Sequence, residues 1–136
     1  MASRLIFDTP TVFEFVNTKM HLSMVQGMVG IGLERNGALV AGVVYEGRNP
    51  HNVWMHVAAE PGSKWMTKEY LRACFSYPFL VLGVSAVRGY VDASNTLARR
   101  FDEHLGFKQE AVLEGAAADA GDVVIYRMKR SECRYV

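Results

Sequence analysis

The sequence predicts one α/β domain in which a mixed β-sheet carries helices on its faces, and three observations lead to it. Asn36-Gly37 stands between two β-prone runs, and this dipeptide is the strongest short-range signal of a hairpin. Helical spacing of apolar residues begins near Lys64, after the predicted strands. Ser94 and Asn95 follow a short Val- and Tyr-rich strand and supply the N-cap of a second amphipathic helix. An antiparallel meander, a helix–strand–helix unit and a final strand pair give a mixed sheet.

The first sixty residues predict a strand, a short helix and the meander. Residues 4–7 are a candidate strand, and Asp8-Thr9-Pro10 is a helix start because proline is tolerated in the first helical turn. Apolar residues at helical spacing then predict a helix from Thr11 to about Met20. The expected strands of the meander are residues 29–35, 38–45 and 52–58.

The second half predicts two helices around one strand. One helix is expected from about Lys64 to Tyr77, where Pro78 limits it. Residues 86–93 form the strand, and the second helix ends at Gly106, a residue suited to the left-handed position that closes helices. The final strand pair is expected at residues 108–114 and 122–129.

Composition narrows the function classes. A chain of 136 residues with 50% hydrophobic and 21% charged residues fits a single domain, residues 1–136. A formal charge of +1 gives no electrostatic argument for nucleic acid or a membrane surface. Cys74 and Cys133 form neither a disulfide framework nor a Cys-x-x-Cys metal motif, so no metal is expected. The N-terminus lacks the apolar run of a signal peptide, which favours a soluble cytoplasmic protein.

The last third of the chain contains a distinctive set of motifs: Asn95-x-x-Ala98, Leu105-Gly106-Phe107, Glu110, and Tyr126, Arg127, Met128, Arg130 and Glu132 near the end. These motifs resemble the C-terminal half of the GNAT acetyltransferase superfamily. By element order the likeness extends over residues 29–134. It implies a GNAT-like fold and an acetyl-CoA-dependent N-acetyltransferase that transfers an acetyl group to an amine. The chain end also looks like the branch related to protein N-terminal acetyltransferases and to compact phage-borne members.

The resemblance also implies where acetyl-CoA would bind, although each of these positions has an ordinary structural interpretation. The pantetheine would pair with the strand edge Val57-Ala58-Ala59, and the pyrophosphate would meet the turn before the next helix. That turn departs from the family pattern Gln/Arg-x-x-Gly-x-Gly/Ala, because the paired glycines are missing and a bulky tryptophan is present. The implied contacts in the turn are Gly62, Ser63, Lys64, Trp65 and Met66, and those on the last helix are Asn95 (pantetheine or adenosine) and Arg99 (phosphate).

The acid and base of such a reaction are less defined. Where many family members carry a tyrosine acid, this chain has Asp102, which is ionised at neutral pH unless strongly desolvated. The base candidate is His56, whose ordinary pKa lies near working pH, although a lone strand histidine is often structural. Weaker candidates for the amine side are Tyr45, Glu46 and His21.

Two other classes of function stay open. A GNAT fold that has lost catalysis could bind CoA or a protein partner, and an unrelated α+β binding module would bind no CoA. The glycine-rich segment 26–32 resembles a phosphate loop, but it precedes a strand and is interpreted as a strand entry. The sequence does not define the acceptor or the oligomeric state, for which a homodimer is one option.

Overall fold

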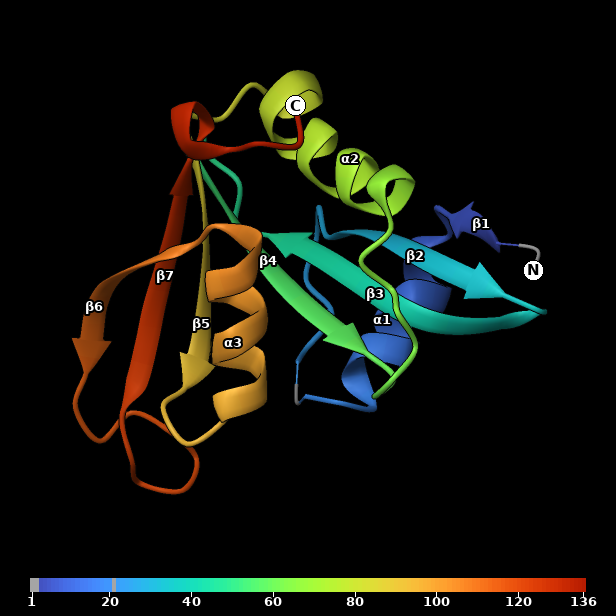
Figure 1. Cartoon of the computed structure of the whole chain (residues 1–136). Helices are drawn as coiled ribbons and strands as arrows, with labels where there is room; N and C mark the ends of the chain where they lie inside the picture. Colours follow the sequence, from blue (N-terminus) through green and yellow to red (C-terminus); the bar gives the residue numbers. More distant parts are fainter. Residues whose placement is uncertain (1–2, 21) are drawn as a thin grey trace.

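The computed structural model describes residues 3–20 and 22–136, which form one seven-stranded sheet with helices on both faces (Figure 1). The strand order is β1-β2-β3-β4-β5-β7-β6, and every neighbouring pair is antiparallel except β4–β5, which is parallel. The mixed sheet, the meander and the final strand pair are therefore confirmed. The strands are β1 (Ser3–Ile6), β2 (Val29–Arg35), β3 (Ala38–Glu46), β4 (Asn52–Ala59), β5 (Ala86–Asp92), β6 (Lys108–Leu113) and β7 (Val123–Lys129).

Three α-helices in the described part of the chain divide the core into two layers. Helix α1 (Thr9–Asn17) covers one face of β2, β3 and β4, while α2 (Lys68–Ser76) and α3 (Thr96–Leu105) lie on the other face (Figure 1). We call these the α1 face and the α3 face of the sheet. In the described residues no helix is long and apolar enough to cross a membrane.

The glycine-rich segment leads into β2, as the sequence indicated, and α1 explains the glycines within the strand. A Cβ added to Gly30 would lie 2.8 Å from Val12 Cβ, and one added to Gly32 would lie 3.0 Å from Val12 Cγ2. A Cβ on Gly42 of β3 would lie 2.9 Å from Val16 Cγ2. Because helix and sheet backbone approach so closely, these strand positions have no room for a side chain.

The first two helices differ from the expected ranges. Helix α1 begins at Thr9 and ends at Asn17, before the expected Met20, and the next residue, Thr18, donates its hydroxyl to the Phe15 carbonyl. Helix α2 begins at Lys68 and not at Lys64.

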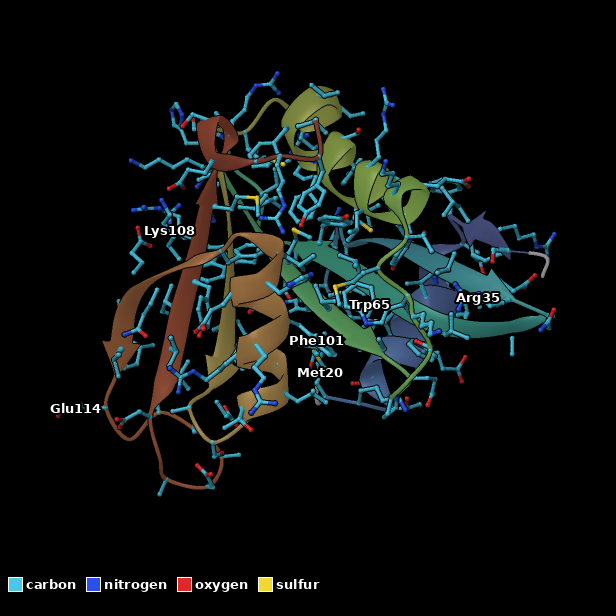
Figure 2. All side chains as sticks on the ribbon, viewed as in Figure 1. Met20, Arg35, Trp65, Phe101, Lys108 and Glu114 are labelled. Carbon is cyan, nitrogen blue, oxygen red and sulfur yellow. The ribbon has the colours of Figure 1, made fainter. Side chains whose placement is uncertain are left out.

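The late start of α2 follows from the burial of one side chain. Trp65 is only 4% exposed and its ring lies edge-on to Phe101 of α3 at 5.6 Å (Figure 2). The chain before Lys68 is non-helical and carries this ring into the core. Thr67 then caps α2, since its hydroxyl accepts from the Tyr70 amide.

Helix α2 ends at Ser76, within one residue of the expected Tyr77, but the helical path of the chain does not stop at Pro78. The chain continues from Tyr77 to Leu82 as a wider turn with π-type hydrogen bonding, and it ends at Gly83 with φ +72°. A proline at the start of this new turn lacks only an amide hydrogen that the turn does not need. Both ends of α3 match the prediction: at its start Asn95 Oδ1 accepts from the Ala98 amide, and after its last residue Gly106 is left-handed with φ +113°.

The parallel pair β4–β5 positions the site because it is short. Its ladder covers only Asn52–Trp54 and Ala86–Arg88, although both strands continue beyond it. Further along, β4 stays paired with β3, and β5 stays paired with β7. The two strands diverge, and the sheet opens into a V between them (Figure 1). Gly89 lies where they separate, since a Cβ there would meet the Met55 carbonyl at 3.1 Å.

Candidate functional site

A cavity of about 360 Å³ occupies the opening between β4 and β5. Because successive strand residues point to opposite faces, the strand residues that line it belong to both faces of the sheet. His56 and Tyr90 come from the α1 face, whereas Met55 and Val57 come from the α3 face. The cavity therefore extends through the sheet. Its other lining residues are Lys19, Met20, Leu22, Gly89, Val91, Asp92, Asn95, Ala98, Asp102, Phe107 and Ala118.

On the α1 face, His56 forms a dyad with a carboxylate. Its Nε2 lies 2.8 Å from Glu46 Oε2, and the side chain is almost fully buried. The register explains the pairing, because β3 Val44 lies opposite His56, and Glu46 is therefore its diagonal neighbour on the same face. Two aromatic rings complete this wall: Tyr90 lies edge-on to His56 at 5.1 Å and 5.9 Å from Trp54.

Two opposing effects act on the pKa of His56. Burial lowers it, and the Glu46 carboxylate partly restores it through its charge and its hydrogen bond. The balance lowers the pKa below the ordinary value of 6.5, so the ring is neutral at pH 7. With a carboxylate accepting from Nε2–H, the free lone pair of the neutral ring is on Nδ1. His56 thus has the protonation state that a general base requires.

On the α3 face, helix α3 directs one side of its surface at the cavity. Asn95, Ala98 and Asp102 are spaced by three and four residues, and all three line it. Burial, with a contribution from the neighbouring Glu103, raises the pKa of Asp102 from 3.8 to about 7. Within residues 3–20 and 22–136 its carboxyl has neither a hydrogen-bond donor nor a cationic partner. The strong desolvation that the sequence left open is therefore present.

The strand edge expected to hold pantetheine is unpaired on one side. Val57, Ala58 and Ala59 pair with β3, but the β4–β5 ladder ends at Trp54. Their backbone groups on the β5 side are therefore available to an extended ligand, which could add to the sheet as a peptide strand does.

The turn between β4 and α2 is held in an amide-presenting conformation. Gly62 has φ +73° and Lys64 has φ +53°, so the chain turns sharply twice. The Arg35 guanidinium of β2 donates to the carbonyls of Ser63 and Lys64, the second at 3.4 Å (Figure 2 labels Arg35). In a trans peptide the N–H points opposite the C=O, so the amides of Lys64 and Trp65 point away from Arg35. Two outward-facing amides near lysine side chains suit an anion.

The tryptophan that departs from the family pattern does not obstruct this turn. The Trp65 ring is buried against Tyr70 and Phe101, on the core side of the segment. Met66 lies beside the same core, and Ser63 has a buried hydroxyl without a partner among the described residues.

The two residues expected on α3 differ in their surroundings. Asn95 caps the helix and also lines the cavity. Arg99 Nε donates to Tyr126 Oη at 3.2 Å, and its Nη1 donates to the Ala93 carbonyl at 3.3 Å. Tyr126 in turn donates to Glu103 Oε2 at 2.6 Å. Arg99 thus fastens α3 to β7, and its contact with a phosphate stays a prediction.

The three weaker candidates for the amine side differ in their positions. Glu46 is the partner of His56, whereas Tyr45 points to the α3 face and donates to the Cys74 carbonyl at 2.6 Å inside the core. His21 lies outside the described residues. Sequence reasoning missed Arg35 and Tyr90; only the strand register could have indicated Tyr90, and no local signal indicated Arg35. In the described residues no group of three or more His, Cys, Asp or Glu could hold a metal ion.

No protein-family model and no curated protein sequence matches the chain. Solved structures do match in shape. Mutant forms of the spermidine/spermine N-acetyltransferase SpeG from Vibrio cholerae superimpose with TM-score 0.75 and 14% identity, over 96% of each chain. The dodecameric spermidine N-acetyltransferase from Vibrio cholerae gives TM-score 0.76 and 16% identity, over 95% of this chain and 94% of that one. A structure assigned only provisionally to the acetyltransferases gives TM-score 0.67 and 22% identity, over 79% of this chain and 60% of that one.

These similarities establish the class of fold. The chain shares its overall fold with the spermidine/spermine N-acetyltransferase over nearly its whole length. The fold is that of the GNAT acetyltransferases, as the C-terminal motifs indicated. At 14 to 22% identity the likeness defines the fold and not the reaction.

Proposed function

We propose that this protein is an N-acetyltransferase that transfers the acetyl group of acetyl-CoA to an amine. The observation that carries the proposal is the cavity through the sheet, which joins a neutral, carboxylate-paired histidine on the α1 face to an open strand edge on the α3 face. Substrates on the two faces would meet inside the opening without crossing each other.

Acetyl-CoA would bind on the α3 face. The pantetheine would pair with the backbone of Val57–Ala59, with Asn95 at the start of α3 on the other side of the opening. The pyrophosphate would accept from the amides of Lys64 and Trp65, next to the Lys64 and Lys68 side chains. When bound, acetyl-CoA supplies an activated acetyl group as a thioester.

The amine would enter from the α1 face, where His56 and Tyr90 line the cavity. His56 Nδ1 would take a proton from the amine as its nitrogen attacks, while Glu46 fixes the ring orientation and stabilises the imidazolium. Catalysis would otherwise come from positioning, because both reactants are held in one small cavity. No metal takes part in this proposal, and it implies a cytoplasmic protein with acetyl-CoA and an amine as its partners.

A second candidate is a GNAT fold that binds CoA or a protein partner without turnover. The altered turn at residues 60–67, which lacks the paired glycines, is the observation in its favour. Binding without acceptor-dependent thiol release would distinguish it from the enzyme.

The test is thiol release from acetyl-CoA in the presence of an amine. Two probes cover different acceptor classes: spermidine, the acceptor named for the structural neighbours, and a short peptide with a free N-terminus. We expect thiol release that depends on one of these amines, with a product heavier by one acetyl group in mass spectrometry. Release at the same rate with and without amine, or none with either, would overturn the proposal.

A further inference from the structure

The cavity has a second ionisable wall that the proposed reaction has not used. Asp102 lies on α3, on the opposite face of the sheet from His56, and both line the same space. The α3 surface that faces the cavity consists of Asn95, Ala98 and Asp102, so the carboxyl is part of the wall that faces the proposed thioester site. Asp102 adds no evident stability to the fold, because no described residue forms an ion pair or hydrogen bond with its carboxyl.

The charged surroundings favour the neutral acid at this position. Lys19, the one lysine of the cavity among the described residues, is paired with Glu60 at 2.9 Å. Glu103, the next residue on α3, accepts from Tyr126 and adds negative charge. The other ionisable residues that line the cavity are His56, Tyr90 and Asp92.

We propose that Asp102 is the general acid of the transfer, giving its proton to the sulfur that leaves the acetyl group. The inference rests on the proposed function. As the amine nitrogen forms its bond to the acetyl carbon, the carbon–sulfur bond breaks and its electron pair goes to sulfur. Asp102 gives its proton to that sulfur and becomes a carboxylate, while His56 holds the proton lost by the nitrogen. Proton exchange with solvent returns both groups to their starting states, so the sum is amine plus thioester to amide plus thiol.

A carboxylic acid suits this role because its proton affinity at this site is matched to neutral pH. Burial keeps the pKa of Asp102 at about 7, where the group is partly protonated and still a competent donor. The same burial lowers the pKa of His56 on the other wall. One cavity thus favours a neutral base and a neutral acid at the same pH.

Asp102→Asn tests the role, since an amide has the shape of the acid but no acidic proton. We expect kcat for thiol release to fall about 100-fold, the lower end of what general acids contribute. Acetyl-CoA affinity, measured by calorimetry, should stay within about twofold. Asp102→Glu should restore part of the rate, and Glu69→Gln, which removes an exposed carboxylate of α2, should behave as wild type. Spermidine and the peptide serve as acceptors.

A second readout does not depend on turnover. In protein labelled with ¹³C at the aspartate carboxyls, one signal should titrate near pH 7 and be missing from Asp102→Asn. Two results would overturn this inference alone. One is a titration of that signal near pH 4, and the other is full activity of Asp102→Asn under conditions in which the wild-type protein is active. Wild-type protein that releases no thiol with either amine would overturn the proposed function and this inference together.

Discussion

The two walls of the cavity show how one environment acts on two kinds of acid. His56, on β4, is buried and Asp102, on α3, is half-buried, and both line the same opening in the sheet. Burial disfavours the charged form of each, so it lowers the pKa of the histidine and raises that of the aspartate. The walls differ in their partners: Glu46 limits the shift of His56, whereas Glu103 increases that of Asp102.

The comparison shows that partners, and not burial alone, decide how far each group moves. A carboxylate near a histidine counteracts desolvation, and a carboxylate near an aspartate adds to it. Each of the following variants changes one side of this comparison.

The largest expected effect is on stability, in Asp102→Asn. A pKa raised from 3.8 to about 7 lowers the unfolding free energy by up to about 4 kcal/mol once pH exceeds both values. The penalty is absent below pH 3.8, where folded and unfolded chains are both protonated, and it is complete above pH 7. The variant should therefore be more stable than wild type at pH 8 and equal to it near pH 3.5. Denaturant unfolding at the two pH values measures this, and an equal difference at both would contradict the assignment.

His56→Ala should have the next largest effect. Loss of a general base should lower kcat by about 100-fold or more, while acetyl-CoA affinity remains unchanged because the residue lies on the α1 face. Thiol release and calorimetry measure the two quantities. His56→Gln, which keeps a hydrogen-bonding side chain beside Glu46, serves as the second variant. Full activity in both would leave water as the base.

Glu46→Gln should lower kcat by about tenfold, because the ring of His56 loses its charged partner. The carboxylate raises the pKa of His56, so its removal should lower that pKa further. The acidic limb of kcat/KM against pH should then move to lower pH, with the same amine used for both proteins. A limb that moves to higher pH would mean that Glu46 does not act on His56.

Lys64→Glu should give the smallest effect, a fall of about three- to fivefold in CoA affinity. The reversed charge would repel the pyrophosphate bound near the amides of Lys64 and Trp65. The effect on affinity is small because water and salt screen the charge at this exposed site. Calorimetry with CoA measures it, and Lys129→Glu, at the exposed end of β7, controls for overall charge. Equal affinity in Lys64→Glu and wild type would move the phosphate site elsewhere.

Local patterns predicted most of the fold. The Asn36-Gly37 turn and the Asn95 cap act over a few residues, so the sequence alone indicated the meander and α3. The predicted start of α2 was wrong, because the true start depends on the contact between Trp65 and Phe101. These residues are 36 positions apart in sequence, and no local pattern encodes their contact. The helical turn beyond Pro78 was not predicted, because proline usually limits a helix. Here Pro78 lies in the first turn of a new helical segment, where proline is tolerated.

The site was predictable in part. Helical spacing of Asn95, Ala98 and Asp102 could have shown that Asp102 shares a face with the residues of the resemblance. Its desolvation could not be predicted, because it depends on the divergence of β4 and β5. Likewise, the pairing of Glu46 with His56 needs the β3–β4 register, and Arg35 reaches the turn from β2.

The most direct test of the account is a calorimetric titration of the purified protein with acetyl-CoA, with CoA measured beside it. The account predicts saturable binding of both, with one ligand per chain and a dissociation constant in the roughly micromolar range. No heat of binding at millimolar ligand would mean that the open edge of β4 and the turn after it do not form a CoA site. The chain would then be an interaction module built on an acetyltransferase fold.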